Sequence, residues 1–174
     1  MARHAEVPDV VAPDLDVLFC GVNPGRWSGA VGHHFAHPGN RFWKALHLAG
    51  FTARQLDPAE ERLVLDARIG ITNLVRRTTA SAADLDLAEL REGAVALERK
   101  VRQLRPRSVA FLGMGAFRVA FRQPRARAGR QPELLADAVI WLLPNPSGLQ
   151  ATYGLDHVVE QLKALRAFVR ARSG

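Results

Sequence analysis

Four short, continuously apolar segments are spread along the chain, with turn-forming or charged residues close behind each of them. Apolar runs of this length that lack polar alternation are typical of parallel strands covered by helices on both faces. The pattern therefore predicts four buried strands, at residues 17–21, 69–74, 108–112 and 139–143.

Helical patterns alternate with these strands. The clearest covers residues 87–104, where apolar residues recur at steps of three and four, with Asp86 as a natural N-cap and Glu89 three residues later. Further helices are predicted at residues 40–50, 58–66, 113–121 and 155–170, whereas the Arg-rich stretch 123–131 is predicted to be a solvated loop. Strands that alternate with helices predict an α/β fold, a three-layer α/β/α arrangement around a short, mainly parallel sheet.

The length of 174 residues, without a repeat or linker, predicts a single domain over residues 1–174. No apolar stretch approaches the roughly 18 residues that span a bilayer, and the N-terminus lacks a signal-peptide pattern, so we expect a cytoplasmic protein without a membrane partner. The single cysteine, Cys20, excludes an internal disulfide and a cysteine-rich metal site. Because Cys20 lies inside an apolar run, it is predicted to be a buried, inert thiol.

The net charge of +7 and a sequence pI near 10.9 favour an anionic partner, nucleic acid first. Lysine occurs only at Lys44, Lys100 and Lys163, so nearly all the positive charge is arginine. The planar guanidinium suits phosphate because it donates two hydrogen bonds at once. A genome with a bias toward arginine codons explains the same composition, so the charge is supporting evidence only.

Two of the predicted strands end in similar turns. Residues 21–25 (GVNPG) close the first strand, and residues 144–149 (PNPSGL) follow the last. Each turn places one asparagine among residues that favour tight turns, at the strand end where open α/β folds build their sites. One such turn alone indicates only a change of chain direction. Two of them predict a shared site.

Together with residues 35–43 (FAHPGNRFW) and 77–79 (RTT), these turns resemble the mismatch-specific uracil-DNA glycosylases, relatives of thymine-DNA glycosylase in the uracil-DNA glycosylase superfamily. The matching segments follow the family's order over most of the chain. The resemblance implies a uracil-DNA glycosylase-like fold and a monofunctional DNA N-glycosylase of base excision repair. Such an enzyme flips uracil out of duplex DNA and hydrolyses its N-glycosidic bond, leaving an abasic site. Mispaired thymine and modified cytosine are further candidate substrates.

The partner implied is double-stranded DNA that contains uracil or a G:U or G:T mismatch, and we expect a monomer. After Leu149 the chain reads Gln150-Ala151, where relatives often carry Ser-Arg. Loss of that arginine weakens the expected contact with the base opposite the lesion.

The resemblance assigns catalytic roles to both turn asparagines. Breaking the glycosidic bond passes through an oxocarbenium-like sugar, which a water attacks as the base leaves with negative charge. The neutral amide of Asn23 is no strong general base, but its carbonyl oxygen can orient the water. Asn145 is matched to the position that stabilises the departing uracil anion through a hydrogen bond.

Other residues are implied to hold the base and the DNA. Phe35, in a loop bounded by His, Gly and Pro, matches the aromatic that stacks on the flipped base. The backbone around Gly25 would read the uracil carbonyls, and the Ser28 hydroxyl can bond a base or phosphate. Leu149 matches the apolar wedge that enters the duplex where the base departed. The predicted DNA contacts are Ser147, Gly148 and Leu149.

A carboxylate can supplement Asn23. Asp84 and Asp86 follow the RTT segment, on a loop that leaves the second strand at the same sheet edge. Because Asp86 is explained as a helix cap, Asp84 is the second candidate catalytic residue, with a solvated loop acid as its alternative. The nearby histidines are His33, His34 and His37. No carboxylate or cysteine completes a metal site with them, so neither metal nor cofactor is expected.

Two other functions compete. A non-catalytic nucleic-acid-binding α/β domain explains the arginine content, but it predicts aromatic and basic residues interleaved on a stacking surface, a pattern the sequence does not show. Residues 113–115 (GMG) lie between a strand and a helix, as in nucleotide-binding enzymes. They lack the third glycine of the dinucleotide fingerprint, so a structural glycine pair is the simpler interpretation.

Overall fold

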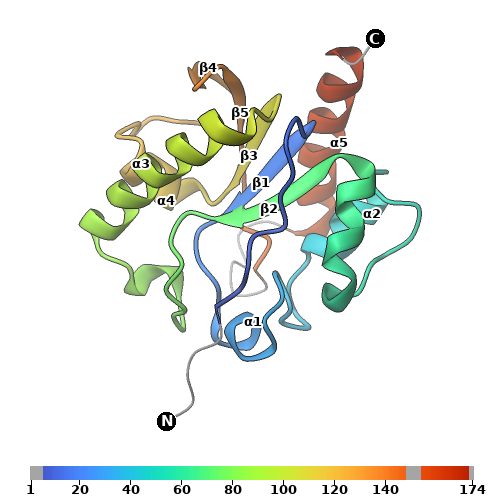
Figure 1. Cartoon of the computed structure of the whole chain (residues 1–174), viewed down its shortest axis with the longest axis horizontal. Coiled ribbons are helices and arrows are strands. Elements are labelled where there is room, and N and C mark those ends of the chain that lie inside the picture. The colour runs from blue at the N-terminus through green and yellow to red at the C-terminus, as the bar shows by residue number, and fades with distance from the viewer. Residues whose placement is uncertain (1–5, 148–153, 173–174) are drawn as a thin grey trace.

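A five-stranded sheet forms the centre of the computed structural model, which describes residues 6–147 and 154–172 (Figure 1). The strand order is β2-β1-β3-β5-β4, and all neighbours are parallel except β4, which runs antiparallel to β5. The strands are β1 (Val17–Gly21), β2 (Ile69–Asn73), β3 (Ser108–Leu112), β4 (Gly129–Leu135) and β5 (Ala138–Leu143). The register aligns Gly21 with Asn73 and with Leu112, so the parallel strands end at one edge of the sheet.

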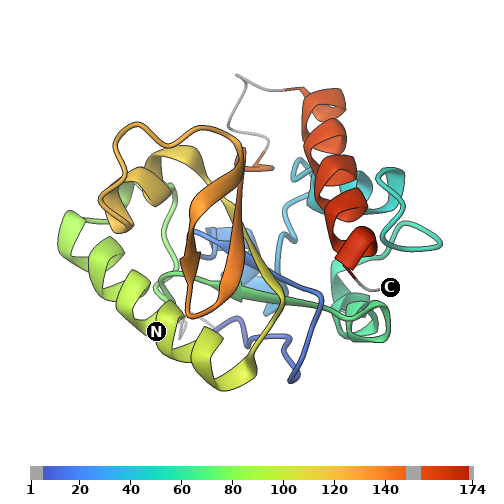
Figure 2. The ribbon, with the colours of Figure 1, turned by 90° about the horizontal axis from the view of Figure 1, so that it is seen from above.

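Helices cover both faces of the sheet (Figure 2). One core cluster joins Val17 and Phe19 of β1 to α2 (Phe42–Leu48) and α5 (Leu155–Arg172). The other joins Leu18 and Cys20 to α3 (Leu87–Leu104) and α4 (Met114–Ala120). Alternate residues of one strand thus point into opposite cores, as a pleated strand requires. The predicted three-layer α/β/α fold is confirmed.

The remaining helical elements precede or follow β1 and β2 in the chain. They are α1 (Arg26–Val31) and two 3-10 helices, η1 (Pro58–Ala67) and η2 (Ala82–Asp84). The capping box predicted for α3 is present, with the Asp86 carboxylate accepting from the Glu89 amide at 2.8 Å. The segment predicted as a helix at 58–66 is a 3-10 helix, and α1 was not predicted because its six residues follow a turn motif.

The prediction of a solvated loop over residues 123–131 is wrong at its end, because Gly129–Leu135 forms β4. This strand lies at the sheet edge and carries Arg130, Pro132 and Glu133, and its pairing with β5 is shifted between Arg130 and Leu134. An edge strand has one free side and tolerates proline and charge. Its composition therefore looks like that of a loop.

Cys20 is fully buried among apolar side chains, as predicted. Burial raises the pKa of its thiol well above the usual range, so Cys20 stays protonated and unreactive. Within residues 6–147 and 154–172, no helix is both long and apolar enough to cross a membrane.

Candidate active site

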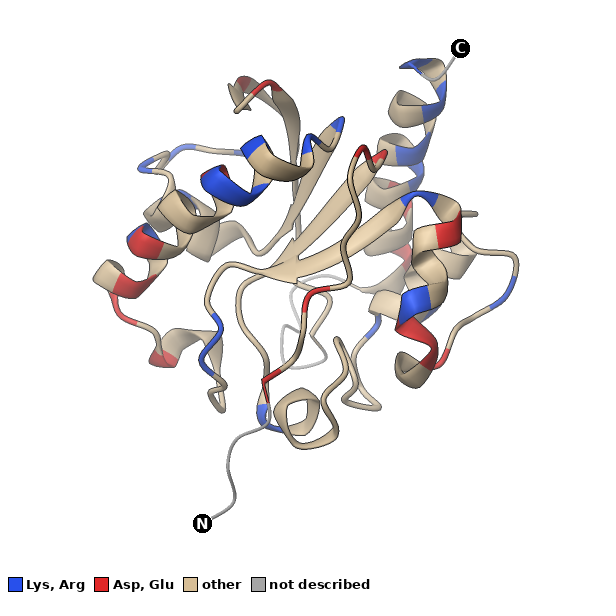
Figure 3. Ribbon diagram, in the orientation of Figure 1, with Lys and Arg blue, Asp and Glu red and all other residues tan. Residues whose placement is uncertain are grey.

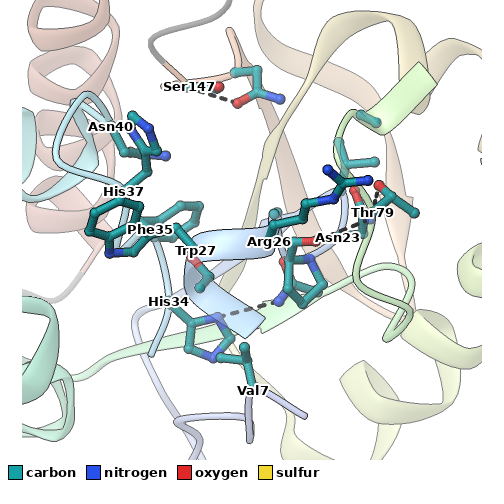
Figure 4. Close-up of a pocket in the computed structure, with 18 of the residues that line it drawn as sticks. Val7, Asn23, Arg26, Trp27, His34, Phe35, His37, Asn40, Thr79 and Ser147 are labelled. Carbon is teal, nitrogen blue, oxygen red and sulfur yellow. Dashed lines mark hydrogen bonds between the residues drawn. The ribbon is translucent and has the colours of Figure 1, made fainter. Parts of the chain in front are cut away.

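A cavity of about 570 Å³ opens at the edge where the parallel strands end (Figure 4). Its wall is built by segments far apart in sequence: the ends of β1 and β2, α1, the loop at residues 34–40, the turn at 79–82 and the turn after β5. This volume lies in the range of sites that enclose a small organic ligand. Of the residues proposed from the sequence, six line the cavity: Asn23, Gly25, Ser28, Phe35, Asn145 and Ser147.

The amide of Asn23 is held in one orientation. Its Nδ2 donates to the backbone oxygen of Arg77 at 2.8 Å and to Oγ1 of Thr79 at 2.7 Å. The Thr79 hydroxyl in turn donates to the Ser81 backbone oxygen at 2.6 Å, so it must accept from Asn23. Both amide protons are therefore used, and Oδ1 has no hydrogen-bond partner among the described residues. The arrangement leaves a fixed acceptor at the cavity wall.

The loop that carries Phe35 is anchored from several sides. Phe35 itself has a left-handed backbone (φ 52°), and its ring packs on Phe42 with centroids 4.2 Å apart and planes tilted by 32°. Ser28 is buried, and its hydroxyl accepts from the Ala36 amide at 3.1 Å. The buried carboxylate of Glu61 accepts from the backbone amide of His34 at 2.7 Å. These anchors hold the Phe35 ring against the cavity, supported from behind by Phe42.

Two cavity residues, His34 and Asn73, were not proposed as ligand-binding residues. The His34 ring is buried, with Nε2 2.8 Å from the Pro8 backbone oxygen and Nδ1 3.3 Å from Nδ2 of Asn73. A carbonyl can only accept, so Nε2 carries the proton and Nδ1 accepts from Asn73. Burial lowers the pKa of His34, in agreement with this neutral form. Within the part of the chain that the structure describes, no three His, Cys, Asp or Glu side chains could hold a metal ion.

The position of Asn73 depends on Gly21. The two residues are paired across β1 and β2, and a Cβ at Gly21 would lie only 2.7 Å from Oδ1 of Asn73. The glycine thus makes room for the Asn73 amide over the end of β1. The strand-end position of Asn73 was the available sequence signal, since ligands in open α/β sheets bind at these ends.

The turn after β5 is tied to the Phe35 loop. The Asn145 Oδ1 accepts from the Ser147 amide at 2.9 Å, which leaves its Nδ2 as the donor group. Arg41 donates from its backbone amide to the Pro146 oxygen at 3.0 Å and from Nη2 to the Ser147 oxygen at 3.3 Å. Asn145 and Ser147 thereby line the same cavity as Asn23 and Phe35. The predicted DNA contacts Gly148 and Leu149 lie outside the described residues.

Gly25 and Asp84 occupy different surroundings. Gly25 precedes α1 at the cavity, and a Cβ built on it meets no atom within 4 Å. Asp84 does not line the cavity: its carboxylate accepts from the Ser81 amide at 3.1 Å within the η2 turn. Its backbone oxygen accepts from Arg77, whose guanidinium also pairs with Glu89. These contacts are those of a turn-stabilising acid.

Exposed arginines lie near the cavity. Positive positions lie on α3 and α5, and Figure 3 also shows them at the start of α1 and on the loop after β2. In the sequence, α1 begins with the exposed Arg26, and the exposed Arg76 and Arg77 follow β2. Positive charge at the mouth of a cavity attracts an anionic polymer such as the nucleic-acid backbone.

Comparisons with known proteins bear on the fold and the family of the chain. The chain is similar to the solution NMR structure of a candidate uracil DNA glycosylase from Methanosarcina acetivorans, with a TM-score of 0.65 over 94% of this chain and 97% of the other. At 17% identity this similarity supports the fold alone. The family model of the Uracil DNA glycosylase superfamily matches residues 8–168. Because that match covers nearly the whole chain and includes every element lining the cavity, the chain belongs to the Uracil DNA glycosylase superfamily.

Proposed function

We propose that this protein is a monofunctional DNA glycosylase that removes uracil from DNA, including uracil mispaired with guanine, and leaves an abasic site. The observation that carries the proposal is the fixed amide of Asn23, whose oxygen is left for a ligand in the same cavity as the Phe35 ring. Mispaired thymine and modified cytosines are candidate secondary substrates. The partner is double-stranded DNA, bound by a monomer.

Asn23 orients the attacking water. Its Nδ2 is fully occupied, so the group it offers to a water is the carbonyl oxygen. An amide oxygen accepts a hydrogen bond from the water without removing its proton. The bond to the base breaks, positive charge develops on the sugar, and the water attacks C1′ of the deoxyribose. The water loses its proton to solvent once the new C1′–O bond forms, and the departed base anion takes up a proton. Because activation is weak, excision is slow and favours bases that leave readily.

Phe35 and Asn73 bind the flipped base. The Phe35 ring, supported by Phe42, supplies a stacking face. Since neutral His34 accepts one Asn73 amide proton, the orientation of Asn73 is fixed, and its Oδ1 lies above Gly21 at the cavity wall. An amide oxygen accepts a hydrogen bond from the N3–H of uracil or thymine. The N3 of cytosine is unprotonated and has no proton to donate to that oxygen. This contrast favours uracil.

Asn145 stabilises the leaving base. Its Oδ1 is used by the Ser147 amide, so Nδ2 is the group that donates to a uracil oxygen as it gains negative charge. Loss of one such donor reduces rates by about 10²–10³ in other enzymes. Gly25 admits the base edge close to the backbone, and Ser28 acts by holding the Phe35 loop. Leu149, preceded by Ser147 and Gly148, is the proposed wedge.

Asp84 is assigned to the turn rather than to the reaction. Its carboxylate is engaged by the Ser81 amide and does not line the cavity. Asp84→Asn keeps the shape of the side chain and can still accept from Ser81. We therefore expect excision at close to the wild-type rate, whereas a loss as large as that of Asn23→Ala would restore Asp84 as a base.

The test is uracil excision from a duplex with one G:U pair. Protein is incubated with end-labelled DNA in the presence of chelator, and abasic sites are revealed by alkaline strand cleavage on a gel. We expect cleavage at the uracil with wild-type protein, and a loss of at least about 100-fold in Asn23→Ala. An intact strand at protein concentrations that saturate the DNA would favour the non-catalytic binding domain instead.

A further inference from the structure

An exposed tryptophan lies at the mouth of the cavity. Trp27 is 50% exposed although it lines the cavity, whereas Trp43 and Trp141 are 4% and 8% exposed in the core. The edge of its ring contacts His37, with centroids 5.4 Å apart and planes at 71°. His37 is in turn fixed by its Nδ1, which accepts from the Gly39 amide at 2.9 Å. The tryptophan is thus supported at one edge and open to solvent.

Arg26 lies beside it on the same helix. Its guanidinium has no hydrogen-bond or ion-pair partner among residues 6–147 and 154–172, unlike Arg77, which pairs with Glu89. In Figure 4 the side chain of Arg26 extends toward Thr79, away from Trp27. The mouth therefore combines an aromatic ring and an unpaired cation. Proteins that bind single-stranded nucleic acid use this pair of groups, with rings stacking on bases and cations binding the backbone.

We propose that Trp27 and Arg26 form a binding subsite for the nucleotide next to the flipped uridine in an unpaired DNA strand. Trp27 stacks on the neighbouring base, and Arg26 binds a phosphate. The inference rests on the proposed function, because it places uracil in the cavity. It adds to that function a contact with the neighbouring nucleotide, which a single-stranded or locally unpaired strand can make.

The physical reason for a preference is the state of the neighbouring base. In a duplex that base is paired and stacked on its own neighbours, so contact with Trp27 requires further unstacking. In a single strand the base is free to swing onto the exposed ring. Stacking on an aromatic side chain strengthens binding by on the order of tenfold per base. Trp27 therefore contributes chiefly to binding of unpaired DNA.

Tryptophan fluorescence tests the subsite without relying on activity. The ligands are single-stranded oligomers with a central 2′-fluoro-2′-deoxyuridine, whose fluorine resists glycosidic cleavage. In two further oligomers, the 5′ or the 3′ neighbour is replaced by a tetrahydrofuran spacer, which keeps the phosphate and removes the base. We expect the intact oligomer to quench the exposed Trp27, and one of the two spacers to weaken wild-type binding about tenfold.

The variants decide the assignment. Trp27→Ala should bind the intact oligomer about tenfold more weakly and lose all sensitivity to the spacer, whereas Trp27→Phe should retain most of both. Arg26→Ala should reduce the dependence of binding on salt by about one phosphate contact. The matched controls are both on α3: Leu87→Ala, at an apolar residue about as exposed as Trp27, and Arg99→Ala, at an exposed arginine.

If the spacers weaken binding equally in wild type and Trp27→Ala, the subsite is overturned. Tighter binding by Trp27→Ala would also overturn it, because the ring would then obstruct the DNA. The substrate preference requires Trp27→Ala to weaken binding of single strands about tenfold and of duplex by less than about twofold. Equal losses would refute it. Excision of ordinary deoxyuridine is measured in parallel. If binding depends on Trp27 and the neighbouring base but no uracil is excised, the proposed glycosylase activity is refuted. If uracil is excised but binding does not depend on Trp27 and the neighbouring base, only the subsite is refuted.

Discussion

Replacing Thr79 by valine tests how the orientation of Asn23 is maintained. Thr79 is 7% exposed, and valine has nearly the same shape, so the change removes a hydroxyl and leaves the packing of the turn. The hydroxyl accepts from Asn23 Nδ2 at 2.7 Å and donates to the Ser81 oxygen at 2.6 Å. Without it, one amide proton of Asn23 loses its acceptor, while the bond to the Arg77 oxygen at 2.8 Å remains.

The magnitude follows from one hydrogen bond. The net contribution of such a bond is about 0.5–1.5 kcal/mol, and an unsatisfied buried donor costs about 1–3 kcal/mol. Asn23 is only partly buried, so water can replace part of the lost contact. A loss near 1.4 kcal/mol corresponds to about tenfold in the rate of the chemical step. This is well below the loss expected for Asn23→Ala, which removes the oxygen proposed to orient the water.

The measurement is single-turnover excision of uracil at saturating protein, with the Kd for DNA and the thermal midpoint determined separately. We expect Thr79→Val to slow excision about tenfold with little change in Kd, because Thr79 acts through Asn23. Thr79→Ser keeps the hydroxyl and should excise at close to the wild-type rate. A valine variant as fast as wild type, or a serine variant as slow as valine, would refute the proposed role of Thr79.

Four other perturbations probe the cavity. Phe35→Ala should weaken binding or excision of the flipped base by about 1–3 kcal/mol, whereas Phe35→Tyr should keep most of it; equal losses would refute stacking. Gly25→Ala should leave the thermal midpoint unchanged, because its Cβ meets no atom, but slow excision if the base edge approaches there. Gly21→Ala should lower both stability and activity, because its Cβ would collide with Asn73; an unchanged thermal midpoint would contradict this packing. Because burial lowers the pKa of His34, the unfolded chain binds a proton at this residue before the folded chain does as pH falls. The stability contributed by neutral His34 is therefore full above about pH 6.5 and declines below it. Between about pH 8 and pH 5 the thermal midpoint should fall less steeply in His34→Gln than in wild type.

The four parallel strands and the turn asparagines could be predicted because their signals are local. Continuous apolar runs placed β1 and β3 at the correct residues, and strand ends rich in small and polar residues pointed to Asn23 and Asn145. The capping box of α3 is likewise contained in a few neighbouring residues. Each of these features is determined by residues that are close together in the sequence.

The remaining parts of the site depend on contacts between distant segments. Asn73 reaches the cavity because the register pairs it with Gly21, and its amide is oriented by His34, 39 positions away. The partners of Asn23 lie 54 and 56 residues along the chain. A local sequence pattern cannot predict contacts between residues that far apart in the chain. Asp84 illustrates the reverse case, since a carboxylate close to the site in sequence accepts from the Ser81 amide within its own turn.

The surroundings of Asn23 also limit how the protein can evolve toward faster catalysis. A carboxylate at position 23 would be a better base, but it would meet the Arg77 backbone oxygen, which can only accept, and a Thr79 hydroxyl already committed to Ser81. The exchange of asparagine for aspartate is a small chemical step that this wall disfavours, because an amide nitrogen with two N–H donors would be replaced by one oxygen that faces two acceptors. A faster descendant would first have to rebuild the turn at residues 77–81. The acceptors around position 23 therefore favour an amide there, independently of the role of Asn23 in the reaction.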